Sequence, residues 1–392
     1  MERSRDIRTL VPAAAGIVGA GGWLLATAPR DAAALAERLG PVLLFVAAMS
    51  VVVNLAADAG AFGYLAAWLQ QRRWPGLPAR AATWVQVVAL ATVSTVFFSL
   101  DTTAIMVTPL AVVLARRSGA DVWAVGLTVV WIANLGSLLL PVSNLTNLLA
   151  VSGGMFGGTG DYLATMWRPA LVAAALAVLA SAVVYRHRSR DRVSADPAVP
   201  RGAPGPLDAR LRVSLGTLGC LLPLLVSPVP YWLSATAAAA VLVVVGIRTA
   251  PTSLSVRLVP WSSLLLVTSL STVAAALHAA GAAAWIGARV MQWETSTAGL
   301  MLLGAVGALL ANAVNNIPAF LALDVGVGDV AGMAALLIGV NAGPVVTPWA
   351  SLATLLWHDQ LRRSGVDVRW RRFVMAGLLL APLAVAAPIL AI

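Results

Sequence analysis

The sequence predicts an all-α polytopic membrane protein built from two inverted-topology repeats, with two re-entrant hairpins and two broken transmembrane helices. Of the 392 residues, 60% are hydrophobic and 11% are charged, and the mean hydropathy is +0.87. A soluble domain has about 25% charged residues. Apolar stretches long enough to cross a bilayer, about 20 residues each, recur along the chain. Arginines stand between these stretches, and polar motifs recur at a constant offset.

Nine apolar runs are predicted to cross the membrane. In chain order they cover 10–28, 40–69, 121–150, 166–185, 213–228, 231–247, 259–283, 331–358 and 373–391. Two further apolar segments, 81–115 and 297–326, carry polar residues in their middle. Each is predicted to be a re-entrant hairpin that enters and leaves the membrane on the same side. Only then do the arginines that follow it lie on the cytoplasmic side, as the other arginine-rich loops do.

The arginines predict the orientation, because cytoplasmic loops of inner-membrane proteins are rich in basic residues. Arginine-bearing segments fall at residues 3–8, 72–80, 116–117, 186–212, 248–257 and 362–372. Loops 151–165 and 327–330 contain no arginine and are expected to be external. The chain is therefore expected in a bacterial inner membrane, with a cytoplasmic N-terminus and an external C-terminus. Its net charge of +10 is divided among loops, which argues against a nucleic-acid partner.

Two halves of opposite orientation follow from this count. Residues 10–185 are predicted to form the first repeat, with hairpin 81–115 and broken helix 121–150. Residues 186–230 supply a cytoplasmic linker and a connecting span. Residues 231–392 are predicted to form the second repeat, with hairpin 297–326 and broken helix 331–358. Inverted repeats with broken helices are typical of secondary transporters.

Residue pairs separated by 207 positions support the duplication. The pairs are Asn134 and Asn341, Gly136 and Gly343, Pro141 and Pro348, Asn144 and Ser351, and Asn147 and Thr354. Gly and Pro interrupt a helix, and the backbone groups that they free must find protein, water or ligand within the bilayer. A polar cavity is therefore expected where the two breaks and the two hairpin tips meet.

The candidate substrate- or ion-binding residues are the polar side chains at these breaks and tips. From the first repeat they are Ser99, Asp101, Thr102, Thr103, Asn134, Ser143, Asn144 and Asn147. From the second repeat they are Asn312, Asn315, Asn316, Asn341, Thr347, Ser351 and Thr354. Helix–helix packing through small and polar residues is the alternative explanation for single Ser and Thr side chains.

Two carboxylates are candidate proton carriers. Asp101 lies at a predicted hairpin tip, and a carboxylate at membrane depth is a functional candidate by default. It could instead hold a cation, or cap the second limb of the hairpin. Asp58, late in the second run, is either a second proton carrier or an interfacial residue. Asp324 is expected at an interface, and a structural role is favoured for His278.

Enzymatic activity is not predicted. The chain contains no lysine, so a Walker A motif cannot occur, and it contains no HExxH, CxxC or GxSxG motif. The single cysteine, Cys220, excludes a cysteine-based zinc site. No cofactor or metal site is predicted. Energy for transport is expected from an ion gradient or from a partner ATPase.

Four motifs resemble the arsenical pump membrane protein family of the ion transporter superfamily. Residues 338–357 resemble its IG-x-x-x-GP-x-x-TP-x-x-SLATLLW signature, and residues 315–318 resemble its NNMP hairpin. Residues 142–147 resemble its VSNLVN break, and residues 101–109 resemble its NDG-x-ALILTP hairpin. The order and spacing hold over about residues 40–390. Leu100 and Thr102 depart from the hairpin pattern, and Val340-Asn341 replaces a Cys-Asp pair that is frequent in the family.

The resemblance implies efflux of arsenite or antimonite against protons, with a soluble ATPase subunit in some members. The residues themselves leave alternatives open: a sodium- or proton-coupled carrier of carboxylates or oxyanions, a Na⁺/H⁺ antiporter, or a channel. A homodimer and a monomer are both compatible with the sequence. Thiolate binding of arsenic is not expected, because Cys220 lies in the connecting span. Asn, Ser and Thr side chains could hold a neutral hydroxide by hydrogen bonds instead.

Overall fold

The computed structural model describes residues 2–71, 76–188, 207–227, 229–281 and 296–392, and within this part of the chain every regular element is a helix. The first half comprises α1 (Glu2–Thr27), α2 (Pro29–Asp58), α3 (Ala61–Gln71), α4 (Ala79–Phe98), α5 (Leu100–Ser118), α6 (Val122–Leu135), η1 (Gly136–Leu138), η2 (Pro141–Ser143), α7 (Leu145–Ser152) and α8 (Thr159–Arg188). The remainder comprises α9 (Ala209–Val226), α10 (Tyr231–Thr249), η3 (Pro251–Ser253), η4 (Val256–Leu258), α11 (Trp261–Ala279), α13 (Thr297–Val314), α14 (Asn316–Leu323), η5 (Asp324–Gly326), α15 (Val330–Ala342), α16 (Leu352–Arg363) and α17 (Trp370–Ile389).

Eight of the described helices are long and apolar enough to cross a membrane. They include α4 and α13, which are the first limbs of the two hairpins. The two broken crossings each divide into shorter helices, α6 with α7 and α15 with α16. The predicted all-helical, multi-pass membrane fold is therefore confirmed. One boundary is wrong: the predicted run 40–69 is α2, which begins at Pro29, followed by the separate helix α3.

A turn at Gly60 separates α2 from α3. Gly60 has φ +81°, a left-handed conformation that costs glycine little and other residues more. The apolar sequence continues across this turn, so hydropathy alone does not reveal it. Residues 72–75, 189–206, 228 and 282–295, which include most of the arginine-rich segment 186–212 and the last residues of the predicted runs 213–228 and 259–283, lie outside the described part of the chain.

Both hairpins turn on a single residue with positive φ. Ser99 (φ 98°) joins α4 to α5, and Asn315 (φ 107°) joins α13 to α14. The Ser99 hydroxyl accepts a hydrogen bond from the Thr102 amide, and the Asn315 side-chain oxygen accepts one from the Ile317 amide. Each tip residue thus caps the helix that follows it, which satisfies amides that would otherwise lie unpaired.

Both broken crossings lose their helix where Gly and Pro interrupt the apolar run. The helix α6 ends at Leu135, and two short 3₁₀ turns lead to α7. The helix α15 ends at Ala342, and residues 343–351 are non-helical before α16 starts. Proline lacks the amide hydrogen that a helix interior needs, so Pro141 and Pro348 are compatible with these interruptions. The breaks lie where the sequence predicts them.

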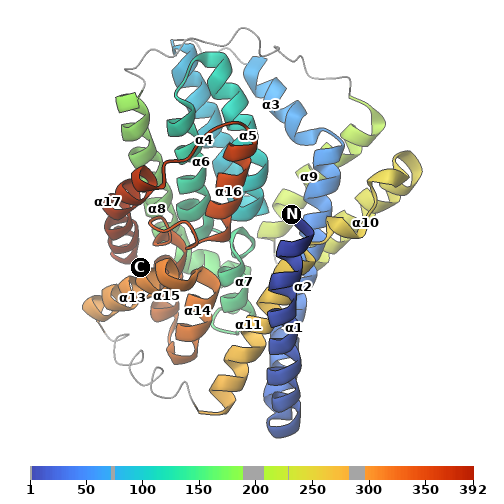
Figure 1. Ribbon diagram of the computed structural model, residues 1–392, viewed down its shortest axis with the longest axis vertical. Coiled ribbons are helices and arrows are strands. Elements are labelled where there is room, and N and C mark those ends of the chain that lie inside the picture. Colours follow the sequence, from blue (N-terminus) through green and yellow to red (C-terminus); the bar gives the residue numbers. More distant parts are fainter. Residues whose placement is uncertain (1, 72–75, 189–206, 228, 282–295) are drawn as a thin grey trace.

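The halves are interlocked with an inverted relationship (Figure 1). The helix α1 packs along α11, and α2 packs along α10. A two-fold operation that relates α1 to α10 and α2 to α11 converts the first of these contacts into the second. Figure 1 shows α1, α2 and α11 as a column beside a second bundle that holds the hairpins and broken helices. Within this second bundle, α8 packs against α17, its own equivalent in the other repeat.

Glycines allow the second hairpin to approach its broken helix closely. A side chain at Gly339 of α15 would overlap the backbone of Gly304 in α13. A side chain at Gly343 would overlap Ala308, also in α13. Small residues at such positions let helix backbones meet inside a membrane, where packing and hydrogen bonds provide the association energy. This contact holds α13 against α15 and thereby positions the break that follows α15.

Candidate functional site

The tip of the first hairpin is joined to the first break. The Ser143 hydroxyl donates to the carbonyl of Val96, the distance between the two oxygens being 2.7 Å. Within the hairpin, the buried Thr103 hydroxyl donates to Ser94 (2.9 Å) and accepts from Thr95 (3.0 Å). The first turn of α5 is thereby tied to the last turn of α4. Thr103 and Ser143 accordingly hold the tip in place through their own hydrogen bonds.

The first break is satisfied largely from within. The side-chain amide of Asn147 donates to the carbonyls of Ser137 (2.7 Å) and Leu140 (3.2 Å), and the Leu140 carbonyl also accepts from the Ser143 amide (3.1 Å). The amide of Asn144 donates to the Ser137 hydroxyl, and its oxygen caps the Thr146 amide. All of these side chains are fully buried. The polar side chains of the break therefore supply hydrogen bonds to backbone groups within it and to one another, as a helix break at membrane depth requires.

The second break is held by the second hairpin. Asn312 accepts from the amides of Val346 (3.2 Å) and Thr347 (3.0 Å), and the Thr347 hydroxyl donates back to the Asn312 carbonyl (2.6 Å). Asn315 donates from its side chain to the Trp349 carbonyl, 2.9 Å away. The backbone amide of Asn316 donates to the carbonyl of Ala350, 3.0 Å away. Each hairpin tip thus contacts the break of its own repeat.

One pair of hydrogen bonds joins the two breaks directly. The Asn341 amide donates to the side-chain oxygen of Asn147, with a distance of 2.8 Å. The hydroxyl of Thr146 donates to the side-chain oxygen of Asn341, with a distance of 2.7 Å. All three residues are buried. The side-chain amide of the equivalent residue of the first repeat, Asn134, donates instead to the Val130 carbonyl of its own helix. The repeat-related asparagines therefore have different roles.

The first hairpin also meets the second break. The helices α5 and α16 pack against each other, and Arg116 near the end of α5 donates to the carbonyl of Ser364 at the end of α16. Because α5 and α16 pack against each other with their C-terminal ends together, their N-terminal turns, which hold Asp101 and Ser351, lie toward the same end of this contact.

Buried polar atoms without a partner gather around these helix starts. They are one carboxylate oxygen of Asp101 and the hydroxyls of Ser351 and Thr354, here called the central cluster, none of which has a hydrogen-bond partner in the described part of the chain. Ser351 occupies the cap position of α16 but makes no cap hydrogen bond. Its counterpart Asn144 does cap α7. Buried unsatisfied atoms are rare in native proteins and call for a ligand, an ion or water.

Four helices start in this region: α5, α7, α14 and α16. A helix N-terminus carries a partial positive charge and free amides, so the region favours an anion or an electron-rich neutral oxygen ligand. Asp101 adds a negative group within the same region. Among the described residues, no three His, Cys, Asp or Glu side chains gather as metal ligands. The arrangement suits a small polar solute together with a proton or a cation.

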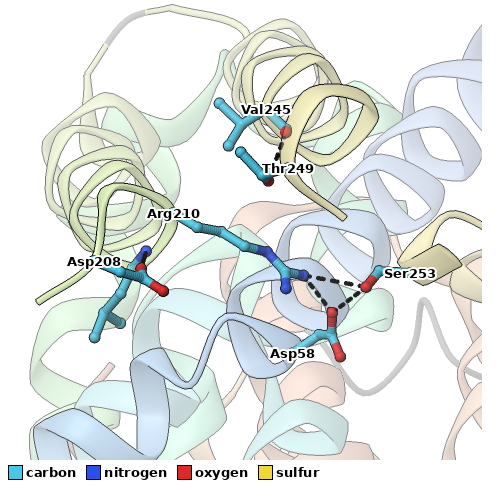
Figure 2. A network of polar contacts seen from close by, with 7 residues as sticks. Asp58, Asp208, Arg210, Val245, Thr249 and Ser253 are labelled. Carbon is cyan, nitrogen blue, oxygen red and sulfur yellow. Dashed lines mark hydrogen bonds and ion pairs between the residues drawn. The ribbon is translucent and has the colours of Figure 1, made fainter. Parts of the chain in front are cut away.

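Asp58 lies apart from this cluster. It is the last residue of α2, half-exposed, and it pairs with Arg210 at the start of α9 and accepts from Ser253 (Figure 2). This position favours the interfacial alternative. Asp324, at the end of α14, is paired with Arg38, with 2.8 Å between the charged atoms. His278 is exposed near the end of α11.

Comparison with known proteins identifies the family. The CitMHS profile, described as "Citrate transporter", matches residues 1–336, most of the chain. The chain belongs to the citrate transporter family. Among its relatives, the arsenical pump membrane proteins of Escherichia coli (strain K12) and Shigella flexneri are each 28% identical over 357 residues, covering 84% of this chain and 81% of the relative. The Yersinia enterocolitica protein of the same name is 26% identical with the same coverage.

A solved structure of similar fold supports the architecture. The crystal structure of the Alcanivorax borkumensis YdaH transporter, described as having an unusual topology, aligns with a TM-score of 0.61 at 15% identity. The alignment covers 91% of this chain and 84% of that chain. At this identity the likeness concerns the fold alone. The family membership and the fold together make this chain a multi-pass membrane transporter.

The candidate set omits two residues that the structure places among the hydrogen bonds of the first break. Ser137 accepts from Asn144 and, through its carbonyl, from Asn147. Thr146 bonds across to Asn341. Both lie within the polar run of the first break, so a rule that counted every polar side chain between the two helix fragments would have included them.

Proposed function

We propose that this transporter exports arsenite or antimonite and couples export to proton influx. The names of the aligned relatives support the substrate class. The observation that carries the proposal is the group of unpartnered buried oxygens at Asp101, Ser351 and Thr354. Arsenite at neutral pH is a neutral trihydroxide, whose hydroxyl groups both donate and accept hydrogen bonds. Such a solute satisfies hydroxyls and a carboxylate without a thiolate.

In this mechanism Asp101 carries the proton. When the carboxylate is ionised it accepts a charge-assisted hydrogen bond from the solute, and when it is protonated only a weaker acceptor oxygen and an O–H donor remain, so the solute is held less tightly and is released. The solute and the proton therefore compete for the same carboxylate, so that binding of one weakens binding of the other. An antiporter needs this competition. Alternating access follows if the hairpin bundle moves against the column of α1, α2 and α11, so that the cluster opens to one side at a time.

The test is arsenite resistance and accumulation in a sensitive bacterial strain. Expression of the wild-type chain is expected to confer resistance and to lower cellular arsenite. Asp101→Asn is expected to abolish both effects, because the amide cannot exchange a proton. Asp161→Asn is the matched control, since Asp161 is an exposed carboxylate in the first turn of α8. Absence of resistance with the wild-type chain rejects the substrate, and an active Asp101→Asn variant rejects the coupling residue.

A second candidate function is coupled transport of a carboxylate or an oxyanion. The family description and the four helix starts around the cluster favour it. Reconstituted vesicles distinguish the candidates: uptake of labelled citrate that depends on sodium or on a pH gradient supports this alternative. Competition between citrate and arsenite for one saturable uptake supports a shared site. A current that grows with voltage and does not saturate with solute indicates a channel.

We also propose a cytoplasmic N-terminus and an external C-terminus, on the basis of the distribution of arginines. Reporter fusions at the two ends test this orientation, and equal reporter activity at both ends contradicts it. A soluble ATPase subunit and a homodimer are further parts of the proposal. Co-purification with candidate ATPases tests the first, and cross-linking of membranes at low expression tests the second.

A further inference from the structure

A cavity lies beside the candidate site and is not part of it. This cavity, here called the vestibule, has a volume of about 510 Å³ and is bounded by α2, α7, α11 and α14. Ser152 of α7 and Leu321 of α14 line it, together with Ser271 and His278 of α11. The helices α7 and α14 start at the central cluster and end at the vestibule. The vestibule therefore lies on a route between the cluster and one face of the protein.

Arg38 of α2 closes one wall of the vestibule. Its guanidinium donates twice to the carbonyl of Leu149 in the last turn of α7, at 3.1 Å from Nε and 2.9 Å from Nη2. Nη2 also pairs with the carboxylate of Asp324 at the end of α14, 2.8 Å away. A single side chain from the column of α1, α2 and α11 thus holds one helix from each repeat in the other bundle.

The end of α7 is shaped to receive this guanidinium. Gly153 follows α7, and a Cβ placed there would lie 2.9 Å from Cζ and Nη2 of Arg38. The backbone of Gly153 has φ −74°, a conformation open to any residue. Glycine at this position is therefore explained by the space that Arg38 occupies, and not by a turn that only glycine could adopt. Alanine at this position would displace the guanidinium without changing any charge.

The packing between the bundles is uneven on the two sides of the cluster. On the vestibule side, α2 packs against α7 and α11 packs against α14. Under the repeat symmetry, the contact of α2 with α7 corresponds to a contact of α11 with α16. The contact of α11 with α14 corresponds to a contact of α2 with α5. Within the described chain neither of these related pairs packs comparably, although α3 reaches α5. The structure is therefore closed on the vestibule side of the cluster, and Arg38 spans the closed seam.

We propose that Arg38 is the gate residue of the transport cycle: its bonds to Leu149 and Asp324 keep the path between the vestibule and the central cluster closed. This inference rests on the proposed transport function but does not depend on the transported solute. Opening the seam separates α2 from α7 and α14, and the guanidinium must then exchange both partners for water. Arg38 acts through the position of these helices and is a positioning residue.

The test measures access to the cluster from the vestibule face. In a Cys220→Ser background, Ser351→Cys places one thiol in the buried cluster, and the hydroxyl that it replaces has no hydrogen bond to lose. Proteoliposomes are treated with a charged, membrane-impermeant maleimide. A separate Ala34→Cys variant, exposed at the vestibule, identifies vesicles in which this face is outside. No arsenite is needed, so the outcome is independent of the substrate proposal.

With Arg38 intact, labelling at position 351 from the vestibule face is expected to be slow. Arg38→Ala is expected to accelerate it at least about tenfold, because losing charge-assisted hydrogen bonds shifts a two-state equilibrium by such a factor. Gly153→Ala is expected to change labelling in the same direction with all charges kept. This second variant keeps the test decisive if Arg38→Ala proves unstable.

Arg116→Ala is the matched control. Arg116 also donates to a carbonyl at a helix end, but it joins α5 to α16 within one bundle. Its loss is expected to leave labelling from the vestibule face unchanged. Size-exclusion elution verifies that each variant is folded. The proposal is overturned if folded Arg38→Ala and Gly153→Ala both label at the wild-type rate, or if Arg116→Ala accelerates labelling equally.

Discussion

The hydrogen bonds of Asn341 allow a quantitative test of how the two repeats are joined. Asn341→Ala removes the hydrogen bonds to Asn147 and Thr146. It leaves the side-chain oxygen of Asn147 and the hydroxyl of Thr146 buried without these hydrogen-bond partners. Each net bond contributes about 1 kcal/mol, and a buried polar atom left unsatisfied costs about 1–3 kcal/mol. Hydrogen bonds between membrane helices average only about 0.6 kcal/mol. We therefore take the lower part of the 1–3 kcal/mol range, about 1–2 kcal/mol, for each of the two lost bonds. The expected loss of unfolding free energy is about 2–4 kcal/mol.

The assay is reversible unfolding in mixed micelles, followed by tryptophan fluorescence. A double-mutant cycle of Asn341→Ala with Thr146→Ala isolates their direct interaction, for which about 0.6–1.7 kcal/mol is expected. Thr108→Val is the control: the Thr108 hydroxyl is buried without a hydrogen bond among the described residues, so replacing it with a methyl group is expected to be neutral or stabilising. A loss below about 0.5 kcal/mol for Asn341→Ala would refute the reasoning, since it is smaller than one membrane hydrogen bond.

Three other substitutions probe separate contacts. Trp357→Phe removes the 2.8 Å bond from the indole to the Gly126 carbonyl, and thermal unfolding should reveal a loss of about 1–2 kcal/mol; an unchanged melting temperature would contradict this value. Gly339→Ala places a methyl group against the backbone of Gly304, and a loss of about 1–3 kcal/mol is expected, with lower yield of folded protein in membranes. Asp58→Asn removes a half-exposed ion pair, so stability should change by less than about 1 kcal/mol and arsenite resistance should persist; lost resistance in a stable variant would restore Asp58 as a proton carrier.

Local chemistry made the breaks and hairpins predictable from the sequence. Proline and glycine interrupt a helix whatever surrounds it, and in a membrane the interruption must coincide with polar side chains. The motifs around Pro141 and Pro348 therefore locate both breaks before any contact is known. The two hairpin tips follow from polar residues within apolar runs. Arginines then indicate that each hairpin returns to the side from which it started.

The partners of these residues were less accessible to sequence reasoning. Thr146 and Ser137 correspond, 207 residues later, to Ala353 and Pro344. A search for polar residues shared by the two repeats therefore passes over them. The bond between Thr146 and Asn341 exists because α7 packs against α15, and this contact depends on packing along the whole chain. Repeat symmetry also predicts equal roles for Asn134 and Asn341, which the structure does not show.

The role of Arg38 could not be predicted from the sequence either. It lies just before an apolar run, where an arginine normally indicates only the membrane boundary. Its two partners are distant in sequence, a carbonyl of α7 and the carboxylate of Asp324, which directly follows α14. A backbone carbonyl has no signature in the sequence. The need for glycine at position 153 is visible only once the guanidinium of Arg38 is placed beside it, so the seam that these residues close could be recognised only from the fold.

The pairing of α1 with α11 and of α2 with α10 has a consequence for biosynthesis. The first two helices leave the ribosome about 200 residues before their partners. At roughly 5–20 residues per second this interval lasts roughly 10–40 s. During that time the nascent chain must remain inserted without its native neighbours, in contact with lipid or with the insertion machinery. Each half is therefore expected to be unable to mature alone, and halves synthesised as separate polypeptides should accumulate only when both are produced in the same cell.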